Sequence, residues 1–243
     1  MKTQKIFNLV ILDASDSMSS IYDQALSGVN ETISTIRMAQ EEHPDMPQYL
    51  TLASFSAGEQ FLNRIYSAKP IAEVRDITKE DYPLLGCTAL YDAMGTTISE
   101  LQQTITHDDR VLVTIITDGY ENASRTWSGK QIKSLVEELR RLGWTFTYIG
   151  ADQDVDKVAD SIGIKNSLRF SANEEDTRKM FKKEQCSRKR YYAMMKRMMD
   201  MDAPSMCEEA NYFTAPSDDE DNEPEPQEPK KRPSFIEKLF GKK

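Results

Sequence analysis

The sequence predicts an α/β fold with a doubly wound, mostly parallel sheet, one antiparallel edge strand and helices on both faces. Two nearly unbroken apolar runs, residues 6–12 and 111–117, are rich in β-branched side chains, as is typical of strands buried on both faces of a sheet. Segments with apolar residues at helical spacing alternate with such strands over the first 170 residues. This alternation indicates helices that cover one sheet from both sides.

Capping and turn residues mark the boundaries of the predicted helices and strands. Ser19 or Ser20 is available as N-cap of the first helix, and Gly143 stands where the third helix should end. The short segment Ala57-Gly58-Glu59 separates two strands and predicts the antiparallel hairpin. Residues 72–83 have no clear pattern and are left unassigned. The pattern predicts helices at residues 21–40, 88–104, 130–142 and 154–162, and strands at residues 6–12, 49–56, 60–66, 111–117, 144–150 and 167–170.

Composition limits the class of protein. With 243 residues, 39% of them hydrophobic, the chain is long enough for one full-sized domain and an appendage. It has no N-terminal apolar segment typical of a signal peptide and no run of 18 apolar residues, so we expect a soluble, cytoplasmic protein of bacterial type. The three cysteines, Cys87, Cys186 and Cys207, are odd in number and widely spaced, which argues against a disulfide framework and a zinc site.

A polar loop directly follows the first predicted strand. Asp13, Ser15 and Ser17 alternate there, so that in an extended backbone their oxygen atoms can lie on one side. One carboxylate and two hydroxyls are hard oxygen ligands of the kind that Mg²⁺ or Mn²⁺ prefers. Ligand sites in open α/β sheets lie at the carboxyl ends of strands, where this loop is placed. The same residue types also serve turns and helix caps, so a loop without a metal remains the alternative.

Three stretches resemble the von Willebrand factor A (VWA) domain family. Asp13-Ala14-Ser15-Asp16-Ser17 resembles its DxSxS signature, which forms part of a metal-ion-dependent adhesion site (MIDAS). The segments LGCTALYDA, residues 85–93, and VLVTIITDG, residues 111–119, resemble the second and third elements of that site, in the family's order. The resemblance covers about residues 5–170 and implies that Thr88 and Asp118 complete the ligand set.

The resemblance also implies a function. A divalent cation, Mg²⁺ or Mn²⁺, would be held by Asp13, Ser15, Ser17, Thr88 and Asp118, with Asp118 usually acting through water. An acidic side chain of a partner protein would then complete the shell of the metal, which makes the chain a metal-dependent adaptor or scaffold module. Asp16 is expected to point away from the cation.

A metal-dependent phosphate hydrolase is the rival class. Asp13 is a possible nucleophile, but the haloacid dehalogenase pattern requires a second Asp at the position of Ser15, and no glycine-rich phosphate loop follows residues 6–12. His43 and His107 fall in predicted connecting segments away from the site loops. We therefore expect no enzymatic activity.

The chain after the VWA-like domain, residues 1–170, changes in composition. Residues 171–202 form a predicted basic, Met-rich helical extension, with nine basic residues between Arg178 and Arg197 against one acid, Glu184. Three interpretations remain open: a helix packed on the domain with its basic side solvated, a contact with nucleic acid or a membrane surface, and docking of a partner protein. The first interpretation has the most weight. The net charge of −9 disfavours nucleic acid.

Residues 203–233 are rich in proline and acidic residues, with seven acids between Asp218 and Glu228, and predict a disordered linker. Residues 234–243 predict a short amphipathic helix with Ser234 as its cap and Phe235, Ile236, Leu239 and Phe240 on one face. This terminal helix either folds back on the domain or binds a second protein; weak membrane-surface binding is the third possibility. A purely structural domain that interacts only through these extensions is the remaining alternative for the whole chain.

Overall fold

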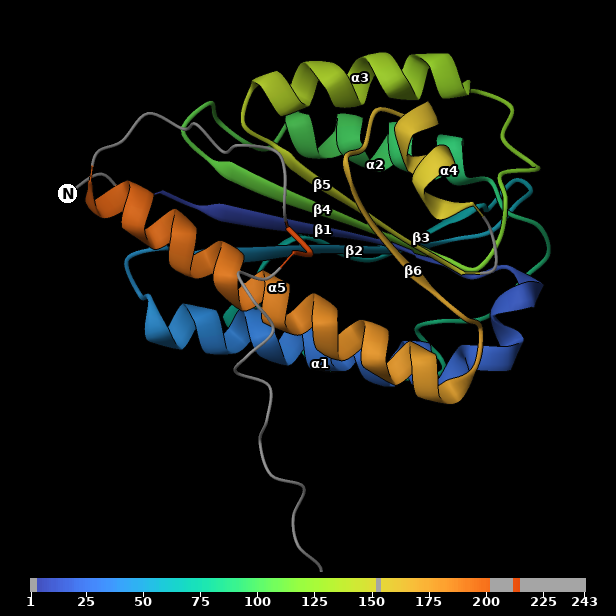
Figure 1. The fold of residues 1–243 in the computed structure, drawn as a ribbon, viewed down its shortest axis with the longest axis horizontal. Coiled ribbons are helices and arrows are strands. Elements are labelled where there is room, and N and C mark those ends of the chain that lie inside the picture. The colour runs from blue at the N-terminus through green and yellow to red at the C-terminus, as the bar shows by residue number, and fades with distance from the viewer. Residues whose placement is uncertain (1–3, 152–153, 202–211, 215–243) are drawn as a thin grey trace, which may run out of the picture.

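A six-stranded sheet forms the centre of the computed structural model, which describes residues 4–151, 154–201 and 212–214 (Figure 1). The strand order is β3-β2-β1-β4-β5-β6, and only the β2–β3 pair is antiparallel. This topology confirms the predicted fold class, including the antiparallel edge strand. The strands are β1 (Ile6–Asp13), β2 (Gln48–Phe55), β3 (Leu62–Pro70), β4 (Arg110–Thr117), β5 (Thr145–Ala151) and β6 (Asn166–Phe170).

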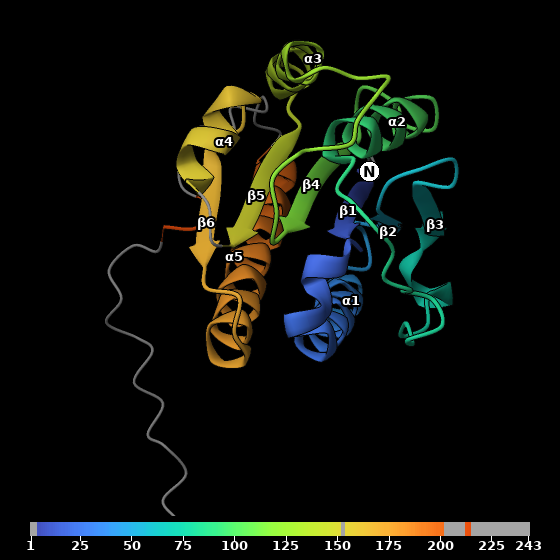
Figure 2. The ribbon, with the colours of Figure 1, turned by 90° about the vertical axis from the view of Figure 1, so that its right-hand side faces the viewer.

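Helices cover both faces of the sheet. Successive side chains of a central strand point to opposite faces, and those on each of the two faces are mostly apolar. In β1, Val10 and Leu12 pack toward α1 (Tyr22–Glu42) and α5 (Glu174–Asp200), whereas Leu9 and Ile11 pack toward the opposite layer. That layer contains α2 (Leu90–Gln102), α3 (Gly129–Arg141) and α4 (Val155–Ser161), as Figures 1 and 2 show. Burial on both faces explains why β1 and β4 are continuous apolar runs.

Several boundaries differ from the sequence prediction. The prediction of Ser19 or Ser20 as N-cap of the first helix is wrong: both lie inside a 3-10 helix, η1 (Asp16–Ile21), and Ile21 precedes α1 without a side-chain cap. The strand β3 continues to Pro70, and a second 3-10 helix, η2 (Ile71–Glu73), leads into the segment that has no clear sequence pattern, residues 72–83. Gly143 follows α3 with a φ of 89°, a conformation that glycine adopts without strain.

Helix α5 packs along α1 on one face of the sheet (Figure 2). Gly28 allows the close approach of the two helices, because a Cβ atom at this position would lie 2.1 Å from the ring of Phe181. Met180, Tyr191 and Met195 of α5 are buried in the same core. The helix predicted for the basic, Met-rich residues 171–202 therefore contributes side chains to the hydrophobic core of the domain.

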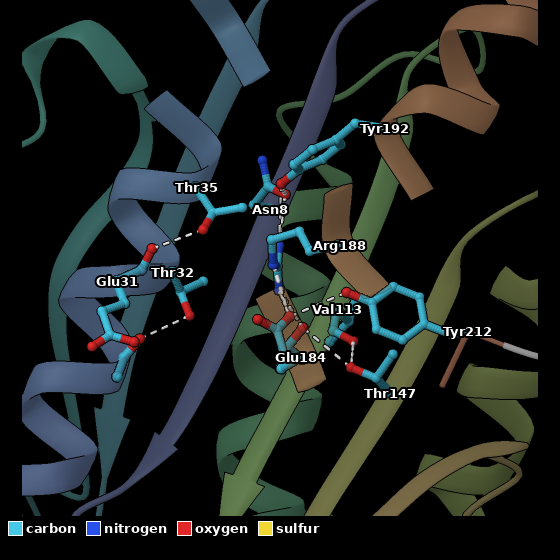
Figure 3. A network of polar contacts seen from close by, with 12 residues as sticks. Asn8, Glu31, Thr32, Thr35, Val113, Thr147, Glu184, Arg188, Tyr192 and Tyr212 are labelled. Carbon is cyan, nitrogen blue, oxygen red and sulfur yellow. Dashed lines mark hydrogen bonds and ion pairs between the residues drawn. The ribbon is translucent and has the colours of Figure 1, made fainter. Parts of the chain in front are cut away.

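The sequence predicts that the basic side of α5 is solvated, but one basic residue of this helix is buried. Arg188 is fully buried between α5 and the sheet, where its guanidinium pairs with the Glu184 carboxylate at 2.8 Å (Figure 3). Burial opposes the charge on Arg188, but Glu184 and the nearby tyrosine hydroxyls hold the pKa of Arg188 well above its usual value. The guanidinium also donates to Asn8 Oδ1 of β1 at 2.9 Å, Thr114 Oγ1 of β4 at 2.7 Å and the Tyr192 hydroxyl at 3.3 Å.

A short piece of the predicted linker, residues 212–214, lies against the domain. The Tyr212 backbone N–H donates to Asn166 Oδ1 at 3.1 Å, and the Tyr212 hydroxyl donates to Glu184 Oε1 at 3.1 Å. Phe213 is buried in the core that α1 and α5 share. The remaining linker and the terminal helix predicted at residues 234–243 lie outside the described residues. No helix in the described part of the chain combines the length and apolar character needed to cross a membrane.

Candidate functional site

The predicted metal ligands lie at one edge of the sheet. β1 and β4 are parallel neighbours, with Leu12 paired with Ile116, so their carboxyl ends meet. Asp13 is the last residue of β1, and Asp118 directly follows β4. Figure 2 views the molecule from the side on which η1 and the carboxyl ends of these strands lie. Strand pairing therefore brings together two carboxylates that are 105 positions apart in the sequence.

Asp13 is held rigidly inside the protein. One carboxylate oxygen accepts the Ser15 backbone N–H at 2.8 Å, and the other accepts the Thr117 hydroxyl at 2.6 Å. Burial raises the pKa of Asp13 to about 6, the hydrogen bonds from Thr117 and Ser15 oppose this rise, and the Asp118 carboxylate adds to it. A carboxylate in such a place is costly to keep charged, and a bound cation would offset that cost.

The two serine hydroxyls connect the carboxylates. Ser15 Oγ and Ser17 Oγ are 3.0 Å apart, and the Ser17 hydroxyl donates to Asp118 Oδ1 at 2.6 Å. Thr88 approaches the same place from the second loop. A Cβ atom on Gly119 would lie 3.5 Å from Thr88 Oγ1 and 3.7 Å from Ser17 Oγ, so the residue after Asp118 lies close to both hydroxyls. The oxygen atoms of the ligand set thus converge from three separate loops.

Backbone hydrogen bonds fix the relative positions of the loops. Asp16 does not point at the other ligands: its Oδ1 accepts the Gly86 backbone N–H at 3.0 Å, and its own N–H donates to the Gly86 carbonyl at 3.0 Å. Gly86 adopts a φ of 62°, which favours glycine here. Asn122 binds both backbone groups of Thr88, accepting its N–H at 3.0 Å and donating to its carbonyl at 3.1 Å.

The donor set suits a hard divalent cation. Asp13, Ser15, Ser17, Thr88 and Asp118 supply carboxylate and hydroxyl oxygens, with no soft sulfur or imidazole ligand. Within the described residues, no group of three or more His, Cys, Asp or Glu side chains has the arrangement of a metal site. Three of the five oxygen donors in this set are hydroxyls, and the two carboxylates would balance the charge of a divalent cation. Five oxygen donors would leave an octahedral cation one coordination position for a further ligand.

Sequence reasoning missed three residues that hold the site in place. Thr117 orients Asp13, Asn122 positions Thr88, and the Tyr82 hydroxyl donates to the Asp13 carbonyl oxygen. Thr117 had a detectable signal, because it is a hydroxyl residue at the end of a mostly apolar strand and precedes Asp118. Tyr82 had none, because it lies in the segment without a periodic pattern.

Comparisons with known proteins bear on the fold. Neither a protein-family profile nor a curated protein sequence matches this chain significantly. Among solved structures, the pilus adhesin SpaC from Lactobacillus rhamnosus GG is 10% identical, with a TM-score of 0.60 over 79% of this chain and 31% of that one. The PilB minor pilin from Streptococcus sanguinis is 14% identical, with a TM-score of 0.55 over 80% of this chain and 63% of that one.

A domain of the predicted class is also similar in structure. The VWA domain of SpRpn10 is 8% identical, with a TM-score of 0.50 over 73% of this chain and 94% of that domain. This chain spans less than two thirds of the length of PilB, and 45% of proximal thread matrix protein 1 from the mussel byssus. At these identities the likeness concerns the fold alone. The chain has a VWA-like fold.

Proposed function

We propose that this chain is a protein-binding module that uses a divalent cation, Mg²⁺ or Mn²⁺, to engage an acidic side chain of a partner protein. The observation that carries the proposal is the convergence of Asp13, Ser15, Ser17, Thr88 and Asp118 at one edge of the sheet. The cation supplies a positively charged coordination position there. The protein side chains hold the oxygen atoms in place through the hydrogen bonds described above.

The environment of Asp13 favours binding over covalent chemistry. A nucleophilic carboxylate must itself reach the substrate, and Asp13 is 0% exposed. A metal ligand at this position needs to reach only a cation that lies between it and the partner. Ser17 and Asp118 are more accessible and lie nearer the surface. These positions support a site that presents a cation to a partner, and they give little support to a phosphate hydrolase.

Two exposed apolar side chains border the candidate site. Leu85 is 59% exposed and precedes the loop that contains Thr88, while Tyr120 is 56% exposed and follows Asp118-Gly119. Aromatic and large apolar side chains beside a buried polar contact are typical of the centres of protein interfaces. We therefore propose that the partner presents its acidic residue next to apolar residues.

Selection of peptides from a displayed random library on the immobilised full chain tests this proposal. With Mg²⁺ present, the enriched peptides should contain Asp or Glu beside an apolar or aromatic residue, and a chelator should elute them. Leu85→Ser should weaken the binding of a selected peptide about tenfold, because burial of a leucine side chain contributes about 1.5–3 kcal/mol. Peptide affinity is measured by fluorescence anisotropy.

Leu142→Ser is the matched control, since Leu142 is 64% exposed but follows α3, away from the site. It should bind the selected peptide as the unchanged chain does. Enrichment of peptides that have no acidic residue, or binding that a chelator leaves intact, would contradict the proposed mode of recognition.

A further inference from the structure

A groove lies between β6 and the first half of α5. Its volume is about 510 Å³, and it is lined by one face of the helix and by the end of the edge strand. Leu168, Phe170 and Met180 form the apolar part of its lining. The other lining residues are Arg169, Ser171, Asp176, Lys179 and Lys183.

The charged lining of this groove is mainly basic. Arg169, Lys179 and Lys183 are all exposed, and Asp176 is the one acidic residue among the lining side chains. Lys179 is 2.6 Å from the Glu175 carboxylate, an exposed i,i+4 pair that contributes little energy and exchanges readily for another carboxylate. The groove therefore suits an acidic, extended segment.

The chain itself passes beside this groove. Tyr212 bonds to Asn166 at the start of β6, and its hydroxyl reaches Glu184, which is adjacent to Lys183 in α5. Asn166 and Leu168 are two residues apart in a strand, which corresponds to about 7 Å. Tyr212 therefore lies about two strand residues from the part of β6 that lines the groove, and the described residues end two positions later, at Thr214.

The residues that follow Thr214 have the complementary charge. Seven acids lie between Asp218 and Glu228, and the three residues from 215 to 217 span at most about 10 Å when extended. The more distant residues 234–243 fit less well, because they carry three lysines and one glutamate and would bring like charge to a basic groove.

We propose that residues 218–228 of this chain bind in the groove between β6 and α5, with their carboxylates against Arg169, Lys179 and Lys183. The acidic segment and the groove belong to the same chain, so this binding is intramolecular. The contact between Tyr212 and α5 shortens the connection between them, which raises the effective concentration of the acidic segment. The bound segment covers the basic face at the start of α5 and keeps other polyanions away from it.

Zero-length carbodiimide crosslinking of the full chain tests the proposal. The reagent joins carboxylates to amines in direct contact, and mass spectrometry identifies the joined residues. We expect residues 218–228 to be joined to Lys183, and also to Lys179, in the monomeric fraction. The yield should fall about fivefold or more in 1 M NaCl, where the Debye length is about 3 Å.

Lys182 and Lys189 are internal controls, because both are exposed on α5 but lie outside the groove lining. Their crosslinks to residues 218–228 should be several-fold weaker than those of Lys183. Equal yields at all these lysines, or crosslinks confined to dimers, would overturn the proposal.

Retention on heparin tests whether the groove is covered by the acidic segment or is open to an external polyanion. A full-length variant in which the seven acids are replaced by their amides has a net charge of −2 instead of −9 and should elute at higher salt than the unchanged chain. Adding Lys179→Gln and Lys183→Gln to this variant should lower the elution salt more than adding Lys182→Gln and Lys189→Gln, which changes the net charge equally, because only the first pair lines the uncovered groove. Equal effects of the two pairs would mean that the acidic segment does not cover the groove, and would also overturn the proposal.

Discussion

Arg188→Met should lower the free energy of unfolding by about 3–5 kcal/mol, which is the usual cost of removing one partner from a buried ion pair. The substitution leaves the buried Glu184 carboxylate without its positive partner. Asn8, labelled in Figure 3, loses the guanidinium donor that reaches it from Arg188. Thr114 of β4 loses a guanidinium donor as well. Equilibrium unfolding in urea at neutral pH measures the loss.

The methionine side chain fills much of the arginine's volume, so the effect reports mainly the uncompensated charge. Arg197→Met is the matched control, because Arg197 is exposed near the end of the same helix, and it should change stability by less than about 1 kcal/mol. The double variant Glu184→Leu with Arg188→Met should be more stable than Arg188→Met alone, since no unpaired charge remains. A loss below 1 kcal/mol for Arg188→Met would contradict this role of the network.

Asp13→Asn should abolish partner capture while the fold is kept. The amide has the same shape as the carboxylate but can accept only one of the two hydrogen bonds, from Ser15 or Thr117. We therefore expect the unfolding free energy to fall by about 1–3 kcal/mol, the usual cost of a buried donor left without a partner. Asp118 is then the only acid in the ligand set. Affinity for a selected acidic peptide in Mg²⁺ should fall about 100-fold or more, because even residues behind metal ligands contribute 10–100-fold.

Asp160→Asn makes the same chemical change on the exposed surface of α4, where Asp160 pairs with Lys165. This variant should bind the peptide with unchanged affinity. Unchanged peptide binding by Asp13→Asn would remove Asp13 from the mechanism, and unfolding of that variant would show that the residue serves the fold instead.

The sequence was sufficient to predict the fold class and the place where the site residues meet. Continuous apolar runs predict buried parallel strands, and the polar loop after the first run places Asp13, Ser15 and Ser17 at the end of a strand. Thr88 and Asp118 are expected in the same site only from the resemblance to VWA domains. The hydrogen bond from Ser17 to Asp118 follows from this topology. Such features are predictable because they depend on local pattern and strand pairing.

Features that depend on long-range packing were not predictable in the same way. Arg188 is one of nine basic residues between Arg178 and Arg197, and no local pattern distinguishes it from the solvated ones. Its burial requires Asn8 and Thr114, two polar residues within otherwise apolar strands on the face that α5 covers. Asn8 and Thr114 are visible in the sequence as polar residues within these strands. Their partner, Arg188, lies 180 positions from Asn8 and 74 positions from Thr114.

Calorimetric titration of the full chain with Mn²⁺ and Mg²⁺ in the presence of acetate measures whether the five oxygen ligands bind a divalent cation. Acetate stands for the partner's carboxylate. We expect saturable binding of one cation per chain, tighter with acetate than without it, and loss of that binding in Asp118→Ala but not in Asp160→Ala. Absence of saturable binding in the unchanged chain, or equal binding by Asp118→Ala, would contradict the proposed metal site.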